Sequence, residues 1–366
     1  MLIKHTICSF CSVGCGINLI SNNGKVVGTY PYKKHPINEG KNCLRGRSSY
    51  KDIQENRIIV PHQKQQNKLV ESSWEDAFSL INESLKSHSQ DEIGIVVSGE
   101  LTNEENAIIK NFAESRGIKN IGFYSHNFPN FKGYDDLSFA NYEDLKNANF
   151  LFIIGNIIVD NPLIGRRVFM AKDNGVPVFS ADYSDLTTTS INSDKHFKFF
   201  SFSDFLDEFP NEIKNELNKD SIIIFNILES IDNFDKLVEI VKKSNSKILP
   251  VLPGSNSFGT MNYFLPLDKN ELKELLSKIK VLITVEADIL TYDDGDNINL
   301  HNFDSFIAID TSLNGTSSIA DTILPTSLWF EKSGTFTNTV GTNQSFEKVI
   351  EAPETTNSIE HIFSEL

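Results

Sequence analysis

Short runs of apolar residues recur along the chain, each about as long as one buried strand. They cover residues 92–98, 150–154, 177–180, 221–225, 247–251, 280–285 and 305–309. Stretches with helical periodicity lie between several of these runs. Alternation of strands and helices predicts parallel, doubly wound sheets, so the expected fold class is α/β.

Two of the predicted helices have recognisable ends. Ser73 is the expected N-cap of a helix that runs to about Lys86, with Asp76 three residues after the cap. A second, amphipathic helix covers Asn103–Arg116 and ends at Gly117. The longest apolar runs, 150–159 and 222–228, are much shorter than the roughly 20 residues that cross a bilayer. We therefore expect buried strands there and no membrane span.

Size and charge narrow the possible classes of protein. A chain of 366 residues is expected to form two or three packed lobes. Its 34 lysines and arginines against 49 aspartates and glutamates give a net charge of −15, which disfavours binding to nucleic acid. The first residues lack the basic region and long apolar stretch of an export signal. We expect a cytoplasmic protein that does not bind nucleic acid.

The four cysteines form one candidate site. Cys8, Cys11 and Cys15 have the spacing C-x2-C-x3-C, Cys43 follows after 27 more residues, and the remaining 323 residues contain no cysteine. Three close thiolates and one distant thiolate suit the corners of a [4Fe–4S] cubane. Structural zinc, which usually takes two short ligand pairs, and disulfides of a secreted protein are the alternatives. Glycines beside the cysteines permit tight turns and favour the cluster, namely Gly14, Gly16 and Gly46.

The stretch 43–47, Cys-Leu-Arg-Gly-Arg, resembles the N-terminal iron–sulfur domain of the molybdopterin/tungstopterin oxidoreductases, particularly the formate dehydrogenase α subunits. In that family a lysine lies between the cluster and the nearer pterin, and Arg45 has its place here. Arginine keeps the positive charge but differs from lysine in geometry. The alternative for Arg45 is an ordinary surface cation.

Later motifs extend the resemblance from about residue 7 to about residue 353. The loop 253–259 is similar to a loop near the family's pterin site and makes Gly254, Asn256 and Gly259 candidate pterin contacts. The stretch 320–325, ADTILP, resembles an "ADxxLP" signature. EKSGTFTN at 331–338, followed by Gly341 and Gln344, resembles a segment that folds against the cluster domain.

The resemblance implies a division of the chain into three parts. A small N-terminal [4Fe–4S] domain covers residues 1–60, with 327–353 packing back on it. The first α/β lobe is expected to combine residues 61–126 with 247–326. Residues 127–246 are expected to form the second α/β lobe.

The chain also departs from the family pattern. Where complete members have a cysteine or selenocysteine metal ligand, this chain has Ser125 and His126, which are weak candidates for a metal ligand and a proton acceptor. A "GxNP" turn becomes 155–158, Gly-Asn-Ile-Ile, and "DPR" becomes 182–184, Asp-Tyr-Ser. No sequence after Leu366 supplies the family's C-terminal barrel. We therefore expect no complete Mo/W–bis-pterin guanine dinucleotide site.

Three functions follow as hypotheses. The first is a subunit that relays electrons through one [4Fe–4S] cluster within a hetero-oligomeric complex of redox proteins (iron–sulfur, flavin, or hydrogenase and dehydrogenase subunits). The second is a shortened catalytic subunit, of the formate or formylmethanofuran dehydrogenase type, completed by another chain. The third is a scaffold protein in which the four cysteines bind zinc. Electron transfer is favoured over independent catalysis.

Overall fold

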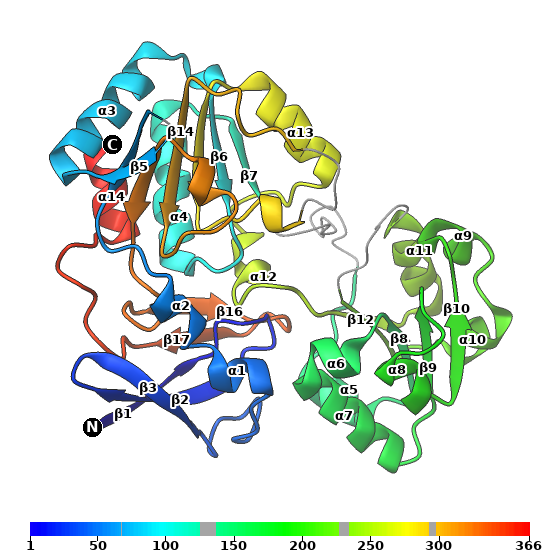
Figure 1. Cartoon of the computed structure of the whole chain (residues 1–366). Helices are drawn as coiled ribbons and strands as arrows, with labels where there is room; N and C mark the ends of the chain where they lie inside the picture. Colours follow the sequence, from blue (N-terminus) through cyan, green and yellow to red (C-terminus); the bar gives the residue numbers. More distant parts are fainter. Residues whose placement is uncertain (67, 125–136, 227–233, 293–297) are drawn as a thin grey trace.

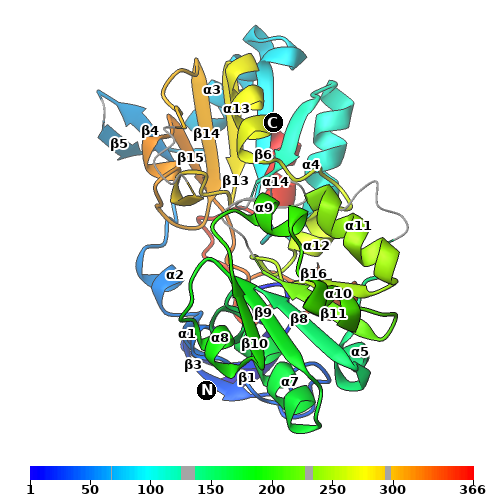
Figure 2. The ribbon, with the colours of Figure 1, turned by 90° about the vertical axis from the view of Figure 1, so that its right-hand side faces the viewer.

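The computed structural model describes every residue except 67, 125–136, 227–233 and 293–297. The chain forms three parts (Figure 1). An N-terminal domain lies at the bottom left of that view, a first α/β lobe lies above it, and a second α/β lobe lies to the right. Turning the molecule brings the second lobe to the front, with the N-terminal domain behind it and the first lobe above (Figure 2).

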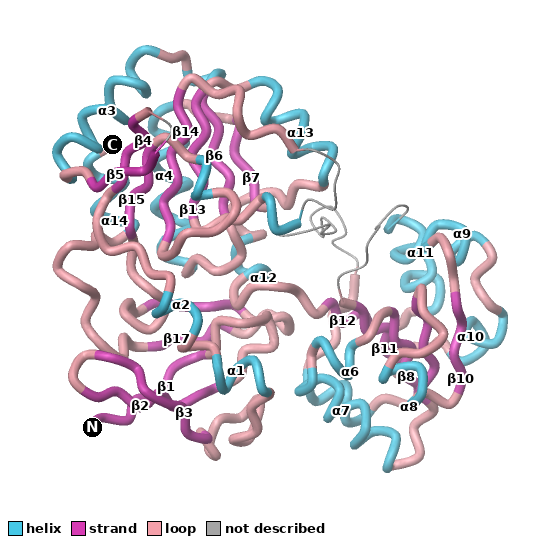
Figure 3. The backbone as a smooth tube through the Cα atoms, in the orientation of Figure 1, coloured by secondary structure: helices cyan, strands magenta, loops and turns pink. Residues whose placement is uncertain are grey.

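The N-terminal domain is built on an antiparallel sheet in the order β1-β2-β3. Two short helices follow the sheet, and a hairpin from far along the chain lies beside it (Figure 3). These elements are β1 (Leu2–Ile7), β2 (Gly16–Asn22), β3 (Lys25–Pro31), α1 (Leu44–Ser48), α2 (Asp52–Glu55), β16 (Gly334–Thr337) and β17 (Asn343–Phe346).

The first lobe contains a mainly parallel sheet in the order β5-β4-β15-β14-β13-β6-β7, with β4 and β5 antiparallel at one edge. Its strands are β4 (His62–Gln65), β5 (Lys68–Glu71), β6 (Ile93–Val97), β7 (Asn120–Phe123), β13 (Val281–Val285), β14 (Ser305–Asp310) and β15 (Thr322–Pro325). Helices α3, α4 and α14 share one apolar core, and α13 packs in a second core on the opposite face. The helices are α3 (Trp74–Ser87), α4 (Asn103–Arg116), α12 (Ser257–Thr260), α13 (Lys269–Lys278) and α14 (Ile359–Glu365), with 3-10 turns at Gln90–Glu92, Leu290–Tyr292 and Ser317–Ile319.

The second lobe contains a parallel sheet in the order β10-β9-β8-β11-β12. Its strands are β8 (Phe150–Ile154), β9 (Val178–Asp182), β10 (Lys195–Lys198), β11 (Ser221–Phe225) and β12 (Lys247–Pro250). Helices α5 to α7 cover one face and α9 to α11 cover the other. The helices are α5 (Tyr142–Asn147), α6 (Ile157–Asp160), α7 (Pro162–Asp173), α8 (Thr188–Asn192), α9 (Phe202–Asp207), α10 (Asn211–Glu216) and α11 (Phe234–Ser244).

Local sequence signals predicted most of these elements correctly. Ser73 accepts a hydrogen bond from the Asp76 N–H at the start of α3 (3.0 Å). Gly117 ends α4 in the left-handed conformation that glycine adopts readily. One detail differs, because residues 247–250 pair with β11 in the second lobe instead of joining the first. An apolar pattern indicates a buried strand, but it does not say which sheet the strand enters.

The apolar core on the α5–α7 side of the second lobe continues into the N-terminal domain. Cys8, Val13 and Cys15 belong to the same buried cluster as Leu163 and Ile164 of α7. The cysteines are therefore enclosed from two sides, by their own loop and by the second lobe.

Candidate iron–sulfur site and adjoining cleft

The cysteine loop joins β1 to β2. The N–H of Cys8 donates to the carbonyl of Cys15 (2.8 Å), which closes the loop at its base. Cys43 is the N-cap of α1, where its Sγ accepts a hydrogen bond from the N–H of Gly46 (3.3 Å). Hydrogen bonds to the sulfurs are one of the features by which proteins tune iron–sulfur clusters.

All four thiols line one cavity. None of them forms a disulfide. Burial raises the pKa of Cys8 to about 12 and also raises the pKa values of Cys11 and Cys15, so the thiols of the apoprotein hold their protons at neutral pH. Thiolates are the ligands of iron–sulfur clusters, so cluster binding must release these protons. The donor set and the cavity fit a [4Fe–4S] cluster.

Two glycines fit closely against the loop. A Cβ on Gly46 would lie 3.4 Å from Cys8 Sγ and 3.7 Å from Cys43 Sγ. Gly14 has φ +76°, and a Cβ there would lie 2.1 Å from Oε1 of Gln344. Gln344 in turn donates to the carbonyl of Gly14 (3.0 Å), so β17 is bonded directly to the cysteine loop.

The second lobe adds polar groups around the thiols. Asn161, at the N-cap of α7, makes no capping hydrogen bond with its side chain, which lies close enough to the Cys11 sulfur to lower the pKa of that thiol, although burial raises it overall. Arg167 lies close enough to Cys15 to favour its thiolate, and its guanidinium stacks 4.5 Å from the ring centre of Tyr142. Tyr142 donates to the carbonyl of Val13 (2.6 Å). These groups hold α5 and α7 against the cysteine loop.

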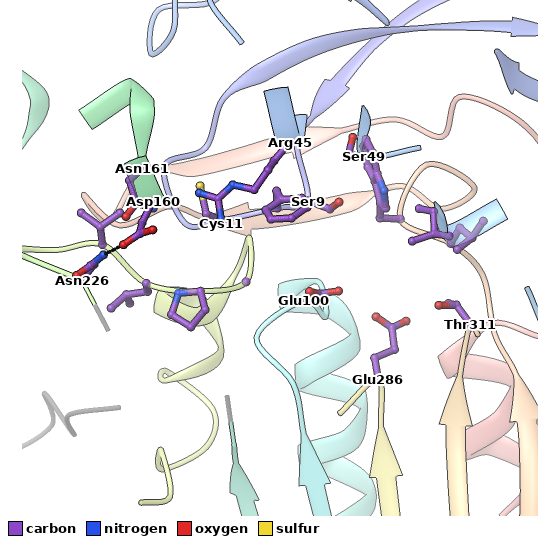
Figure 4. Close-up of a pocket in the computed structure, with 18 residues that line it drawn as sticks. Ser9, Cys11, Arg45, Ser49, Glu100, Asp160, Asn161, Asn226, Glu286 and Thr311 are labelled. Carbon is purple, nitrogen blue, oxygen red and sulfur yellow. Dashed lines mark hydrogen bonds between the residues drawn. The ribbon is translucent and has the colours of Figure 1, made fainter. Parts of the chain in front are cut away.

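A cleft of about 500 Å³ opens beside Cys11, between the three parts of the chain. Figure 4 shows Arg45 reaching from α1 across the cleft, above Glu100 and Glu286 from the first lobe. Asp160, which accepts a hydrogen bond from Asn226 (2.8 Å), lies on the second-lobe side. Arg45 is the cationic side chain of the lining, whereas three lining side chains are acidic.

Glu100 and Glu286 line the first-lobe side of the cleft, and the buried Asp310 lies close enough to influence both carboxyls. Burial raises the pKa of Glu100 to about 7, of Glu286 to about 8 and of Asp310 to about 6. Glu100 reaches solvent within the cleft, yet protein surrounds it closely enough to disfavour its charge. Burial lowers the pKa of Lys332, but attraction to Glu105 and Glu286 outweighs this effect and raises it overall.

The Glu286 carboxyl predicts a specific pH dependence. Its pKa is about 8 in the folded chain and about 4.3 in an unfolded chain. Between these two pH values the folded protein holds a proton on Glu286 that the unfolded chain has released. The stabilising effect of this proton is complete below about pH 4.3 and is lost as pH rises to about 8. We expect Glu286→Gln to make the free energy of unfolding fall less steeply over this range.

Urea unfolding at a series of pH values would measure this slope. Glu83→Gln, a change at an exposed position of α3, is the matched control and should keep the wild-type slope. An unchanged slope in Glu286→Gln would show that another group causes the pH dependence of the free energy of unfolding.

The other residues that the sequence predicted for the site, where the structure describes them, lie partly in the cleft and partly in the protein interior. Arg45 lies over the ring of Phe10, 5.1 Å from its centre, and lines the cleft. Gly254 also lines the cleft, with φ +74°. Asn256 is fully buried and bonds to Leu101, Asn103 and Thr337, and a Cβ on Gly259 would meet Asn256 Oδ1 at 2.2 Å. Ser125 and His126 lie outside the described residues.

Sequence reasoning missed Asn161, Arg167 and the carboxyls of the cleft. Glu286 directly follows β13 and Asp310 ends β14, so both stand at carboxyl ends of parallel strands, where α/β sheets bind ligands. Their positions at the carboxyl ends of predicted strands are a sequence signal that could have identified Glu286 and Asp310. Nothing in the local pattern announces Asn161 or Arg167, because they reach the cysteines only when the lobes pack together.

Two searches of the described residues found nothing. No three His, Cys, Asp or Glu side chains among them converge on one point closely enough to hold a single metal ion, whereas the four thiols line a cavity. In the same residues, every helix is too short or too polar to pass through a bilayer.

Parallel doubly wound lobes beside a cavity lined by four thiols are the features of an iron–sulfur protein of the α/β class. Residues 29–366 match the family model "Molybdopterin oxidoreductase", and residues 1–55 match "Molybdopterin oxidoreductase Fe4S4 domain". The chain therefore belongs to the molybdopterin oxidoreductase family, and its N-terminal domain is a [4Fe–4S] domain of that family. The predicted family and cluster are confirmed.

Curated relatives include formate dehydrogenase subunits. The chain is 34% identical over 253 residues to the F420-dependent formate dehydrogenase subunit alpha of Methanocaldococcus jannaschii, covering 66% of this chain and 37% of that protein. It is 27% identical over 462 aligned positions to the F420-dependent formate dehydrogenase 2 subunit alpha of Methanococcus maripaludis, covering 96% and 68%. NADH-quinone oxidoreductase subunit 3 of Thermus thermophilus is 26% identical over 163 residues, covering 44% and 20%. The chain thus spans only part of each relative.

A solved structure agrees with the fold. Acetylene hydratase from Pelobacter acetylenicus superposes with a TM-score of 0.66 at 14% identity, covering 99% of this chain and 68% of that one. At this identity the likeness concerns the fold alone, and it confirms the predicted α/β class.

Proposed function

We propose that this chain is an iron–sulfur subunit of a formate dehydrogenase-like redox complex, in which one [4Fe–4S] cluster on Cys8, Cys11, Cys15 and Cys43 relays electrons and no Mo/W active site is present. The arrangement of the four thiols around one cavity carries the proposal. Sulfurs spaced around a cavity suit a body with four metal corners. A single zinc ion would instead bind all four sulfurs at Zn–S distances of about 2.3 Å.

The residues of the cleft do not fit a bis-pterin guanine dinucleotide. Such a group carries several phosphates, which bind to cations, glycine-rich backbone and helix N-termini. The cleft offers one arginine against Glu100, Asp160 and Glu286. The family's metal-ligand cysteine also has no counterpart, since no cysteine follows Cys43.

The chemistry of a single cluster implies that the chain has redox partners. A single cluster passes electrons one at a time and needs a donor and an acceptor. Its relatives are named as subunits, of formate dehydrogenases and of an NADH-quinone oxidoreductase. We therefore place the chain in a hetero-oligomeric complex with other redox proteins.

One observation favours the second hypothesis, a catalytic subunit completed by another chain. The cleft of about 500 Å³ adjoins Cys11 and is open to solvent, so a second chain could supply missing cations and a metal ligand.

Elemental analysis of anaerobically purified protein separates the hypotheses. We expect about four irons and about four sulfides per chain, as a cubane requires, without molybdenum or tungsten. Stoichiometric molybdenum or tungsten would support the catalytic subunit, and zinc without iron would support the scaffold.

A further inference from the structure

Charge is distributed very unevenly along the chain. Residues 1–60 contain nine lysines and arginines against three aspartates and glutamates, a net charge of +6. The other 306 residues contain 25 against 46, a net charge of −21. The cluster domain is therefore a basic unit on a strongly acidic protein. Such local asymmetry steers charged partners to one face.

Helix α1 lies directly over the cysteine cavity. Cys43 begins this helix, and Gly46 packs against the sulfurs of Cys8 and Cys43. The same helix has Leu44, Arg45 and Arg47 exposed. On this side of the site a single short helix separates the Cys8 and Cys43 sulfurs from solvent, so its outer surface offers a short route for electrons between the site and another protein.

The surface around α1 combines apolar and cationic side chains. Leu44 is 74% exposed, and Val27 of the adjoining strand β3 is 51% exposed. Arg47 and Lys51 are exposed and form no ion pair with the described residues. We call these four residues the α1 face: Val27, Leu44, Arg47 and Lys51.

Hydrogen bonds join β3 to α1 and to the turn after it. The hydroxyl of Thr29 on β3 donates to the carbonyl of Arg47 (3.3 Å), and the hydroxyl of Tyr50 donates to the carbonyl of Val27 (3.2 Å). The strand and the helix therefore lie side by side. Large exposed apolar side chains with a charged rim are typical of protein-binding surfaces.

We propose that the α1 face docks an acidic one-electron carrier protein. This inference rests on the proposed function, because the docked carrier exchanges its electron with the cluster. One electron leaves the reduced carrier and enters the oxidised cluster, or passes in the opposite direction, and no bond forms. Arg47 and Lys51 attract the carrier's carboxylates, while Leu44 and its neighbours supply a desolvated centre.

Anaerobic stopped-flow mixing of the oxidised protein with a reduced ferredoxin of net negative charge tests the proposal. We expect the bimolecular rate constant to fall as ionic strength rises, because salt screens the attraction. The double variant Arg47→Glu/Lys51→Glu should react about tenfold more slowly at low ionic strength. A positively charged c-type cytochrome should show the opposite salt dependence.

The double variant Lys68→Glu/Lys86→Glu is the matched control. It changes the net charge by the same amount on β5 and α3, at the far end of the molecule from α1 (Figure 1). We expect it to react nearly as fast as the wild type. Equal slowing of both double variants, or a rate independent of salt, would overturn the docking site.

The outcomes also separate this inference from the proposed function. If dithionite reduces the cluster but the bimolecular rate constant does not depend on the charge of the carrier protein, only the docking site is contradicted. Protein without iron contradicts the relay itself. Cosedimentation with vesicles of anionic phospholipid, lost in Arg47→Glu/Lys51→Glu, would assign the α1 face to a membrane surface and overturn the protein partner.

Discussion

Replacing Cys43 with alanine is expected to abolish the intact cubane. The change leaves Cys8, Cys11 and Cys15 as three thiolates, so one iron corner loses its protein ligand. It also removes the N-cap of α1, where Cys43 accepts the hydrogen bond from Gly46. Iron analysis should show fewer than about four irons per chain, and the EPR signal of the dithionite-reduced cluster should be lost.

Ser9→Ala is the control for this experiment. Ser9 lies between Cys8 and Cys11 in sequence and lines the cleft, but it is not among the residues around the thiol cavity. We expect wild-type iron content and an unchanged EPR signal in this variant. A reduced-state EPR signal that also persists unchanged in Cys43→Ala would exclude Cys43 as a ligand.

The second large effect is expected from Arg57→Met, in the segment that joins the cluster domain to the first lobe. Arg57 forms a two-pronged ion pair with Glu331, with Nη1 2.7 Å from Oε1, and the two side chains are only 9% and 5% exposed. Methionine leaves the Glu331 carboxylate buried without its partner. Breaking a buried pair on one side costs about 3–5 kcal/mol, which we expect as the fall in the free energy of unfolding.

Urea unfolding monitored by circular dichroism would measure this loss. Lys243→Met, which removes an exposed pair with Glu239 on α11, should cost less than about 1 kcal/mol. The double variant Arg57→Met/Glu331→Leu should recover much of the loss, because it leaves no uncompensated charge. If Arg57→Met alone is as stable as the wild type, solvent must reach the Glu331 carboxylate after the change.

The helix and strand predictions succeeded where local chemistry decides. The side chain of Ser73 caps α3, and Gly117 ends α4, because both positions depend only on residues a few places away. Residues 247–250 were predicted as a strand for the same reason. Their placement in the second lobe depends on pairing with β11, more than 20 residues earlier, which no local period encodes.

The α1 face shows the same distinction. The excess of cations in residues 1–60 can be counted in the sequence. That Arg47 and Lys51 lie near Val27 depends on the packing of α1 against β3. The sequence alone shows the uneven charge, and the fold shows where these cations lie.

The sequence by itself was enough to predict the four cysteines as the proposed ligand set, since Cys8, Cys11 and Cys15 lie close together along the chain and only Cys43 had to be brought in from a distance. It also determined the α/β class, through apolar runs whose period follows from backbone geometry. Only the tertiary structure decided what surrounds the site: Asn161 and Arg167 on one side, and the cleft with Glu100 and Glu286 on another. Side chains from distant segments meet when lobes bury their apolar faces together, and that packing depends on the whole chain.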